Sequence, residues 1–209
     1  MPGSQNLPQL RMLEVGGLKP RAMRGGEPEE APVLVLSHCI LDRSTRWWQP
    51  GKSIAQNRGP VSQVIEFLSA RNVGAVQLPC PEFSFFGNPR APATKNEYES
   101  LPDFRSHCEN LARDAAQQLK TLTAMACNPK IRILTVIGVE RSPSCGVEFT
   151  PRTVNGETQY VKEKGLFIEF LKKKMRNLGL TMPFLGLDMR RPEESVKRLA
   201  HLLNNIRGE

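Results

Sequence analysis

Apolar residues along the chain form short continuous runs that alternate with longer amphipathic segments. The runs predict four β-strands, at residues 32–37, 74–79, 131–139 and 182–188. Between and after them, apolar residues recur every three or four positions, which predicts helices over 60–72, 103–126, 165–179 and 191–208. Strands that are apolar without alternation are typical of a sheet buried on both faces. We therefore expect an α/β fold, with a Rossmann-like parallel sheet of about four to five strands and helices on both faces.

The first 30 residues differ in composition from the rest of the chain. They are rich in Gly and Pro, end in "GGEPEE", and contain four basic and four acidic residues whose charges cancel. This composition predicts an N-terminal tail or arm over residues 1–30. The remaining length suits one domain, so we expect residues 31–209 to form a single α/β domain.

Charge and hydropathy limit the expected partners. No apolar run approaches the roughly 20 residues that span a bilayer, and the N-terminus lacks the pattern of a secretory signal. We therefore expect a cytoplasmic protein with no membrane partner. The net charge is +8, and residues 162–207 carry 11 Lys and Arg against 5 Asp and Glu. Such a surplus attracts nucleic acid, but no aromatic residues are interleaved for stacking, and the pattern favours solvated helix faces instead.

Cysteines provide the clearest chemical signal. The chain has five, an odd number that in a reducing compartment indicates metal binding or thiol chemistry rather than disulfides. Cys39, Cys80 and Cys145 each follow a predicted strand. Because the carboxyl ends of parallel strands lie at one edge of a sheet, we expect these three thiols to be neighbours. Cys108 and Cys127, inside or at the end of a helical pattern, are predicted to be small buried hydrophobic residues.

Three thiolates suit more than one group. They can bind zinc, with water as a fourth ligand, or an iron–sulfur cluster in which one iron lacks a protein ligand. The chain has no CxxC pair, so the spacing does not separate these two groups. Three functions remain open: a cluster-dependent enzyme, a zinc hydrolase-like protein, and a non-catalytic cluster or sulfide-binding module that delivers sulfur or binds RNA.

Three segments around these cysteines resemble the thiouracil desulfidase family. "SHCILDRSTRW" is similar to the family's "SACLLG…RYDG", and "CPEFSFFGNPR" to its "CPE…GGLPTPR". "RSPSCG", residues 141–146, matches the family's most specific signature. Taken in order, the similar segments cover about residues 33–187. The matching positions in the first two segments are Ser37, Cys39, Leu41, Arg46, Cys80, Pro81, Glu82, Gly87, Pro89 and Arg90.

The chain also departs from the family's pattern. His38 replaces a small residue, Asp42 replaces a glycine, and "RWW" stands where the family has "RYD". The segment "SFFGN" brings aromatic bulk into the second loop. These departures indicate a divergent member.

The resemblance implies a [4Fe–4S] cluster as cofactor, bound by Cys39, Cys80 and Cys145. Its fourth iron would bind the sulfur of a thiolated nucleobase. The implied reaction is the non-redox removal of sulfur from a small thiolated heterocycle such as a thiouracil, with release of sulfide. A thiocarbonyl carbon is a poor electrophile until a thiophilic metal polarises it, and the attacking water then needs a base.

Glu82, two residues after Cys80, is the predicted catalytic base; the alternatives are a helix cap or an ion-pair partner of Arg90. Ser142 is predicted to orient substrate or water, and the alternative is a turn hydroxyl bonded to its own backbone. His38, Asp42 and Arg90 are the candidate substrate-binding residues.

Overall fold

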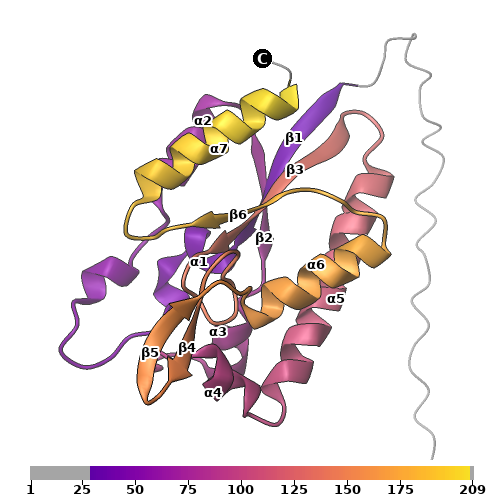
Figure 1. Cartoon of the computed structure of the whole chain (residues 1–209). Helices are drawn as coiled ribbons and strands as arrows, with labels where there is room; N and C mark the ends of the chain where they lie inside the picture. Colours follow the sequence, from indigo (N-terminus) through magenta and orange to yellow (C-terminus); the bar gives the residue numbers. More distant parts are fainter. Residues whose placement is uncertain (1–28, 208–209) are drawn as a thin grey trace, which may run out of the picture.

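Four parallel strands form the central sheet of the computed structural model, which describes residues 29–207 (Figure 1). The spatial order is β2–β1–β3–β6, and every neighbouring pair is parallel. The strands are β1 (Glu30–Ser37), β2 (Gly74–Leu78), β3 (Lys130–Val139) and β6 (Phe184–Leu187). Each coincides with one of the four predicted runs, so the α/β fold and the parallel sheet are confirmed.

Helices cover both faces of this sheet, as predicted. Helix α5 packs on α6 at one face, and α2 lies beside α7 at the other (Figure 1). The four long helices are α2 (Ser62–Ala70), α5 (Phe104–Met125), α6 (Leu166–Asn177) and α7 (Pro192–Arg207). The short ones are α1 (His38–Leu41), α3 (Pro81–Phe86), α4 (Lys95–Glu99) and the 3-10 turns η1 (Arg43–Thr45) and η2 (Ile54–Asn57).

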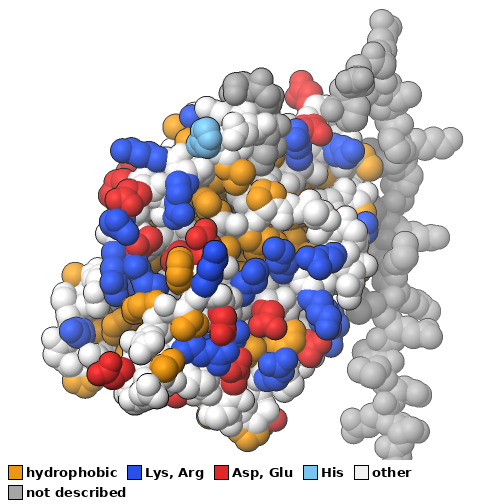
Figure 2. All heavy atoms as spheres, viewed as in Figure 1, with side chains coloured by type: hydrophobic (Ala, Val, Ile, Leu, Met, Phe, Trp, Pro, Cys, Tyr) orange, Lys and Arg blue, Asp and Glu red, His pale blue; other side chains and the backbone are white. Residues whose placement is uncertain are grey.

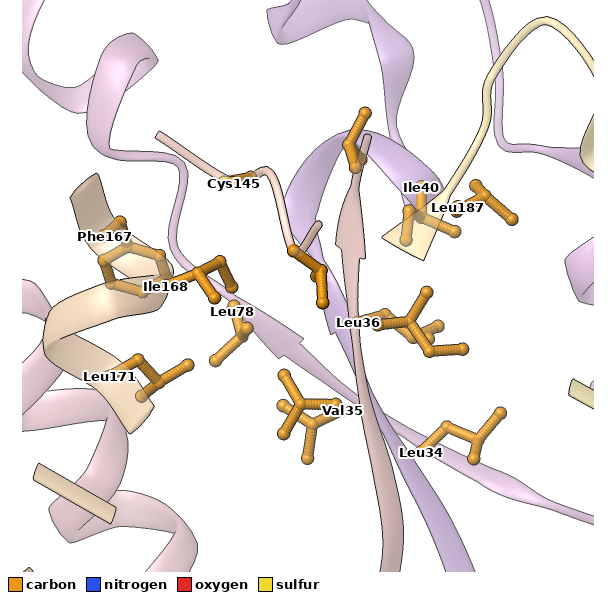
Figure 3. Packing of buried hydrophobic residues seen from close by; sticks show 14 of the residues in the cluster. Leu34, Val35, Leu36, Ile40, Leu78, Cys145, Phe167, Ile168, Leu171 and Leu187 are labelled. Carbon is orange, nitrogen blue, oxygen red and sulfur yellow. The ribbon is translucent and has the colours of Figure 1, made fainter. Parts of the chain in front are cut away.

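The core lies on both sides of the central strand β1. Leu34, Val35 and Leu36 are fully buried. Because successive side chains of a strand point to opposite faces, Val35 lies on the side of α6 while Leu34 and Leu36 lie on the other side (Figure 3). Burial of the same strand on both faces explains why its sequence is apolar without alternation.

The order of the strands indicates which edge of the sheet can bind a ligand. From β1 the chain moves to β2 on one side, and it then returns to β3 on the other side of β1. In open α/β sheets such a reversal leaves a crevice outside the carboxyl ends of the strands. The loops that follow β1, β2 and β3 therefore meet at this edge.

A small antiparallel sheet was not predicted. It consists of β4 (Thr150–Val154) and β5 (Glu157–Val161), joined at Asn155 and Gly156. Both turn residues have positive φ, of 51° and 81°. Asn-Gly is a strong hairpin signal, because both positions of the tight turn require this backbone conformation.

The described part of the chain begins almost at the first strand. Residues 1–28 of the predicted tail lie outside the described residues, and Glu30 already belongs to β1. Within the described part of the chain, no helix has the length and apolarity needed to cross a membrane. Lys and Arg side chains spread over the face shown in Figure 2, with Asp and Glu side chains among them.

Candidate functional site

The cysteines that follow β1 and β2 lie at equivalent positions of two paired strands. Ser37 at the end of β1 is in register with Leu78 at the end of β2. Cys39 and Cys80 each come two residues later. They therefore leave the sheet at the same edge, as predicted.

Cys145 reaches the same edge by a turn that folds back over β3. The N–H of Val139, the last residue of β3, donates to the carbonyl oxygen of Cys145 at 2.9 Å. Gly138 makes this return possible, because a Cβ there would clash with the Cys145 carbonyl and lie 2.6 Å from Val147. At Gly146 a Cβ would lie 2.8 Å from the carbonyl oxygen of Ser142. These glycines thus allow the chain to approach its own backbone.

Helix α6 holds the turn of residues 142–146 from outside. The first amides of α6, at Leu166 and Phe167, donate to the carbonyl oxygens of Pro143 and Ser144 at 3.0 Å each. Inside the turn, Ser142 Oγ accepts the N–H of Cys145 at 3.0 Å and that of Ser144 at 3.3 Å. Ser142 therefore makes the contacts expected of a turn hydroxyl bonded to nearby backbone, which was the alternative to its role in orienting substrate or water.

The three thiols lie within electrostatic reach of one another. Burial, reinforced by Cys80, raises the pKa of Cys39 to about 12. Burial also raises the pKa of Cys145, with Cys39 and Cys80 as the next causes. The pKa of Cys80 is raised by burial and then by Glu82. Without a metal these groups are neutral thiols at physiological pH, and metal binding requires their deprotonation.

Several polar groups surround the sulfur atoms. The N–H of Phe83 points at Cys80 Sγ at 3.4 Å, and Ser144 Oγ at Cys145 Sγ at 3.6 Å. Ser37 Oγ and His38 Nε2, on the two residues that precede Cys39, are buried without a hydrogen-bond partner among the described residues. Buried polar atoms are almost always paired, so these two atoms indicate a partner that residues 29–207 do not supply.

Within residues 29–207, no group of three or more His, Cys, Asp and Glu side chains is arranged to hold a metal ion. Three cysteine thiols at one edge are the donor type that iron–sulfur clusters take, and the Phe83 N–H donates to one of these sulfurs.

Glu82 occupies the centre of a buried hydrogen-bond network. It is the second residue of α3 and only 7% exposed. Its Oε2 accepts from Arg90 at 3.2 Å and from the Tyr98 hydroxyl at 3.3 Å. Its Oε1 accepts from Ser144 Oγ at 2.5 Å and from Ser142 Oγ at 3.3 Å. One carboxylate thus joins the loop after β2 to the cysteine turn after β3, and the ion pair with Arg90 is observed.

The other predicted site residues lie on the surrounding loops. His38 Nδ1 contacts the side-chain amide of Gln77 at 2.7 Å. Asp42 accepts the N–H of Ser44 at 2.9 Å and caps η1, and these hydrogen bonds lower its pKa. Arg90 also donates to the carbonyl oxygen of Thr45 at 2.6 Å, which ties the second loop to the first.

The two helical cysteines differ from each other. Cys108 on α5 is fully buried, as predicted, and burial raises its pKa. The same prediction is wrong for Cys127, which is exposed. Helix α5 ends at Met125, so Cys127 lies beyond the face that packs on the sheet.

Residues that the sequence did not indicate complete the network. Tyr98, on α4, is 4% exposed and donates to Glu82. Ser144 is 1% exposed and makes the shortest contact with Glu82. The segment "TKNE" at 94–97 is a capping-box signal for α4, where the Thr94 and Glu97 side chains are reciprocally bonded. That signal could have placed Tyr98 on a helix, but not against Glu82.

The fold and the site define an α/β protein with cysteines and a buried carboxylate at the carboxyl edge of its sheet. No family model matches the chain. It is 26% identical over 148 residues to an uncharacterized protein, MJ0003, of Methanocaldococcus jannaschii, across 71% of this chain and 80% of the relative. A solved structure of a [4Fe–4S]-dependent thiouracil desulfidase, TudS, covers 82% of this chain and 98% of its own, at 19% identity and a TM-score of 0.43. Both similarities are distant.

Proposed function

We propose that the protein is an iron–sulfur enzyme that removes sulfur from a small thiolated heterocycle, such as a thiouracil, without redox chemistry. The observation that carries this proposal is the meeting of Cys39, Cys80 and Cys145 at one sheet edge, next to the buried carboxylate of Glu82. The sequence signatures around the same residues support it. Water replaces sulfur at the thiocarbonyl carbon, and the two hydrogens of water leave with the sulfur as hydrogen sulfide.

In this proposal the three cysteines hold a [4Fe–4S] cluster through their thiolates. An iron without a protein ligand would supply a thiophilic Lewis acid that polarises the carbon–sulfur bond. The backbone N–H of Phe83 stabilises the thiolate of Cys80, and it lowers the pKa of that thiol against the larger effect of burial.

Glu82 is the proposed general base, which takes a proton from the attacking water. Ser142, bonded both to Glu82 and to the cysteine turn, is the proposed residue that orients water or substrate. Arg90 and Tyr98 fix the carboxylate from the other side. A carboxylate held by four side chains has a defined position, and general acid–base catalysis depends on that geometry.

His38 and Asp42 are proposed to line the substrate edge, together with Arg90. His38 Nδ1 contacts Gln77, and the opposite ring nitrogen, Nε2, is buried and unpaired. A ring nitrogen in this state is suited to a hydrogen bond with a ligand. Asp42 follows α1 directly and lies within electrostatic reach of His38.

The test is turnover of 2-thiouracil by protein purified without air, in the absence of any reductant. We expect sulfide and uracil in equal amounts, and the Cys127→Ser variant, altered only at an exposed thiol, should match the wild type. A protein with its full iron content that releases no sulfide contradicts the enzymatic proposal. Salt-dependent binding of tRNA by that inactive protein would then support a non-catalytic RNA-binding module.

A further inference from the structure

Arg46 is a half-buried cation whose side chain is not held by the fold. It follows η1, in the loop that leaves Cys39, and its backbone N–H closes that turn by donating to Arg43 at 3.1 Å. Its guanidinium has no hydrogen bond, ion pair or ring contact with any described residue. Among the described arginines that are half-buried, it alone is in this state.

The neighbouring arginines, unlike Arg46, bind other groups of the protein through their guanidinium groups. Arg43 donates to the backbone carbonyl oxygens of Gly59 and Arg58. Arg90 pairs with Glu82 at 3.2 Å and donates to Thr45 at 2.6 Å. Arg43 and Arg90 are therefore held by the fold. The Arg46 nitrogens are not among the buried unpaired side-chain atoms of the described residues, so they face solvent and are free to donate to a ligand.

Arg46 also lies close to the reacting part of the proposed site. Burial lowers the pKa of its guanidinium, and the charges that oppose this shift belong to Cys39 and Glu82. Conversely, Arg46 lowers the pKa of Cys39 against the larger effect of burial. The cation is therefore within electrostatic reach of both a proposed cluster ligand and the proposed base.

Resting on the proposed function, we infer that Arg46 binds a carbonyl or carboxylate oxygen of the substrate and selects thiolated compounds that carry one. The guanidinium is planar, always charged and presents several N–H donors, so it recognises such oxygens with defined direction. Glu82, the buried carboxylate of the site, already pairs with Arg90, and Arg46 keeps its donors for the ligand.

This inference predicts selectivity among ring compounds of the same shape. A site built to bond a substrate oxygen discriminates strongly against an analogue that lacks it, because its donors are then left unpaired. 2-Thiouracil has a carbonyl oxygen at C4 in addition to its sulfur at C2, whereas pyrimidine-2-thione has the sulfur alone. Uracil keeps the C4 oxygen and has an oxygen in place of the sulfur, so its binding reports on Arg46 without any turnover.

The experiment measures binding of these three compounds by calorimetry to wild type, Arg46→Gln and Arg46→Lys, with iron content determined in the same samples. The matched control is Arg58→Gln, which removes an equal charge from an exposed side chain of the same loop. We expect Arg46→Gln to weaken uracil and 2-thiouracil binding by about 10- to 100-fold, as for loss of a charged hydrogen bond. Arg46→Lys should bind uracil and 2-thiouracil more tightly than Arg46→Gln and less tightly than the wild type. Pyrimidine-2-thione should bind all four proteins within about threefold.

The inference is wrong if Arg46→Gln loses its iron, because Arg46 then serves the Cys39 thiolate. The inference is equally wrong if Arg46→Gln binds all three compounds more weakly to the same degree, or if the wild type binds neither uracil nor 2-thiouracil. Oxygen-selective binding by a wild-type protein that releases no sulfide would support the inference and reject the proposed reaction. The two proposals therefore fail in different ways.

Discussion

Replacing Glu82 by glutamine tests the proposed base with little change of shape. An amide cannot take a proton from water, and loss of a general base costs about 10²- to 10⁴-fold in rate, or roughly 3–5 kcal/mol of transition-state stabilisation. The network tolerates the change if the amide oxygen faces Arg90 and Tyr98 and the amide nitrogen faces the serine hydroxyls, which can accept as well as donate.

The cost in stability is a separate quantity. The variant exchanges a charged hydrogen bond with Arg90 for a neutral one, and bonds to charged groups contribute about 1.5–3 kcal/mol. Arg90 keeps its bonds to Thr45 and Asn88. We therefore expect the free energy of unfolding to fall by about 1.5–3 kcal/mol, which most domains survive.

The assay combines sulfide release from 2-thiouracil, iron content and urea unfolding on the same samples. The matched control is Glu140→Gln, because Glu140 also lies at the end of a central strand, where it accepts the N–H groups of Glu148 and Phe149 at 3.1 and 3.0 Å. It should lose stability to a similar degree and keep its rate. If Glu82→Gln holds its iron and turns over within a few-fold of wild type, Glu82 is a structural carboxylate and the reasoning is refuted.

Three further outcomes follow from the geometry. Cys39→Ser, Cys80→Ser and Cys145→Ser should each lose iron, whereas Cys127→Ser and Cys108→Ala should keep it; normal iron in any of the first three removes that residue from the ligand set. Gly138→Ala should destabilise the fold by about 1–3 kcal/mol or more in urea and impair iron binding, because the new methyl group meets the Cys145 carbonyl; Gly74→Ala, with its nearest neighbour at 3.2 Å, is the control, and equal stability of the two would contradict the packing argument. In the metal-free protein at pH 8, iodoacetamide should label exposed Cys127 well before Cys39, whose raised pKa leaves little thiolate, and the Cys39 rate should climb as the pH rises toward about 12; equal labelling at pH 8, read by mass spectrometry, would show that Cys39 is not buried.

The sequence predicts the central sheet well, because burial on both faces requires uninterrupted apolar runs such as the one that forms β3. It predicts the positions of Cys39, Cys80 and Cys145 for the same reason: the end of a parallel strand fixes where the next residues lie. Asn155 and Gly156 signal the turn of the β4–β5 hairpin, but its strands have no apolar run that would predict them, because β5 is largely exposed and β4 is buried only at its start.

The partners of Glu82 depend on tertiary structure. Arg90, Tyr98 and Ser144 come from the loop after α3, from α4 and from the cysteine turn, and no local pattern relates these positions. Their meeting depends on how the three loops close over the sheet edge. The same holds for Arg46, because only the fold reveals that its guanidinium has no partner among the described residues.

Iron and acid-labile sulfide, measured per chain in protein purified without air, test the proposed cluster most directly. We predict about four irons and four sulfides, with the broad brown absorption of an iron–sulfur cluster. A colourless protein that contains bound zinc, or that contains no metal after reconstitution with iron and sulfide, would contradict the proposal that Cys39, Cys80 and Cys145 hold a [4Fe–4S] cluster.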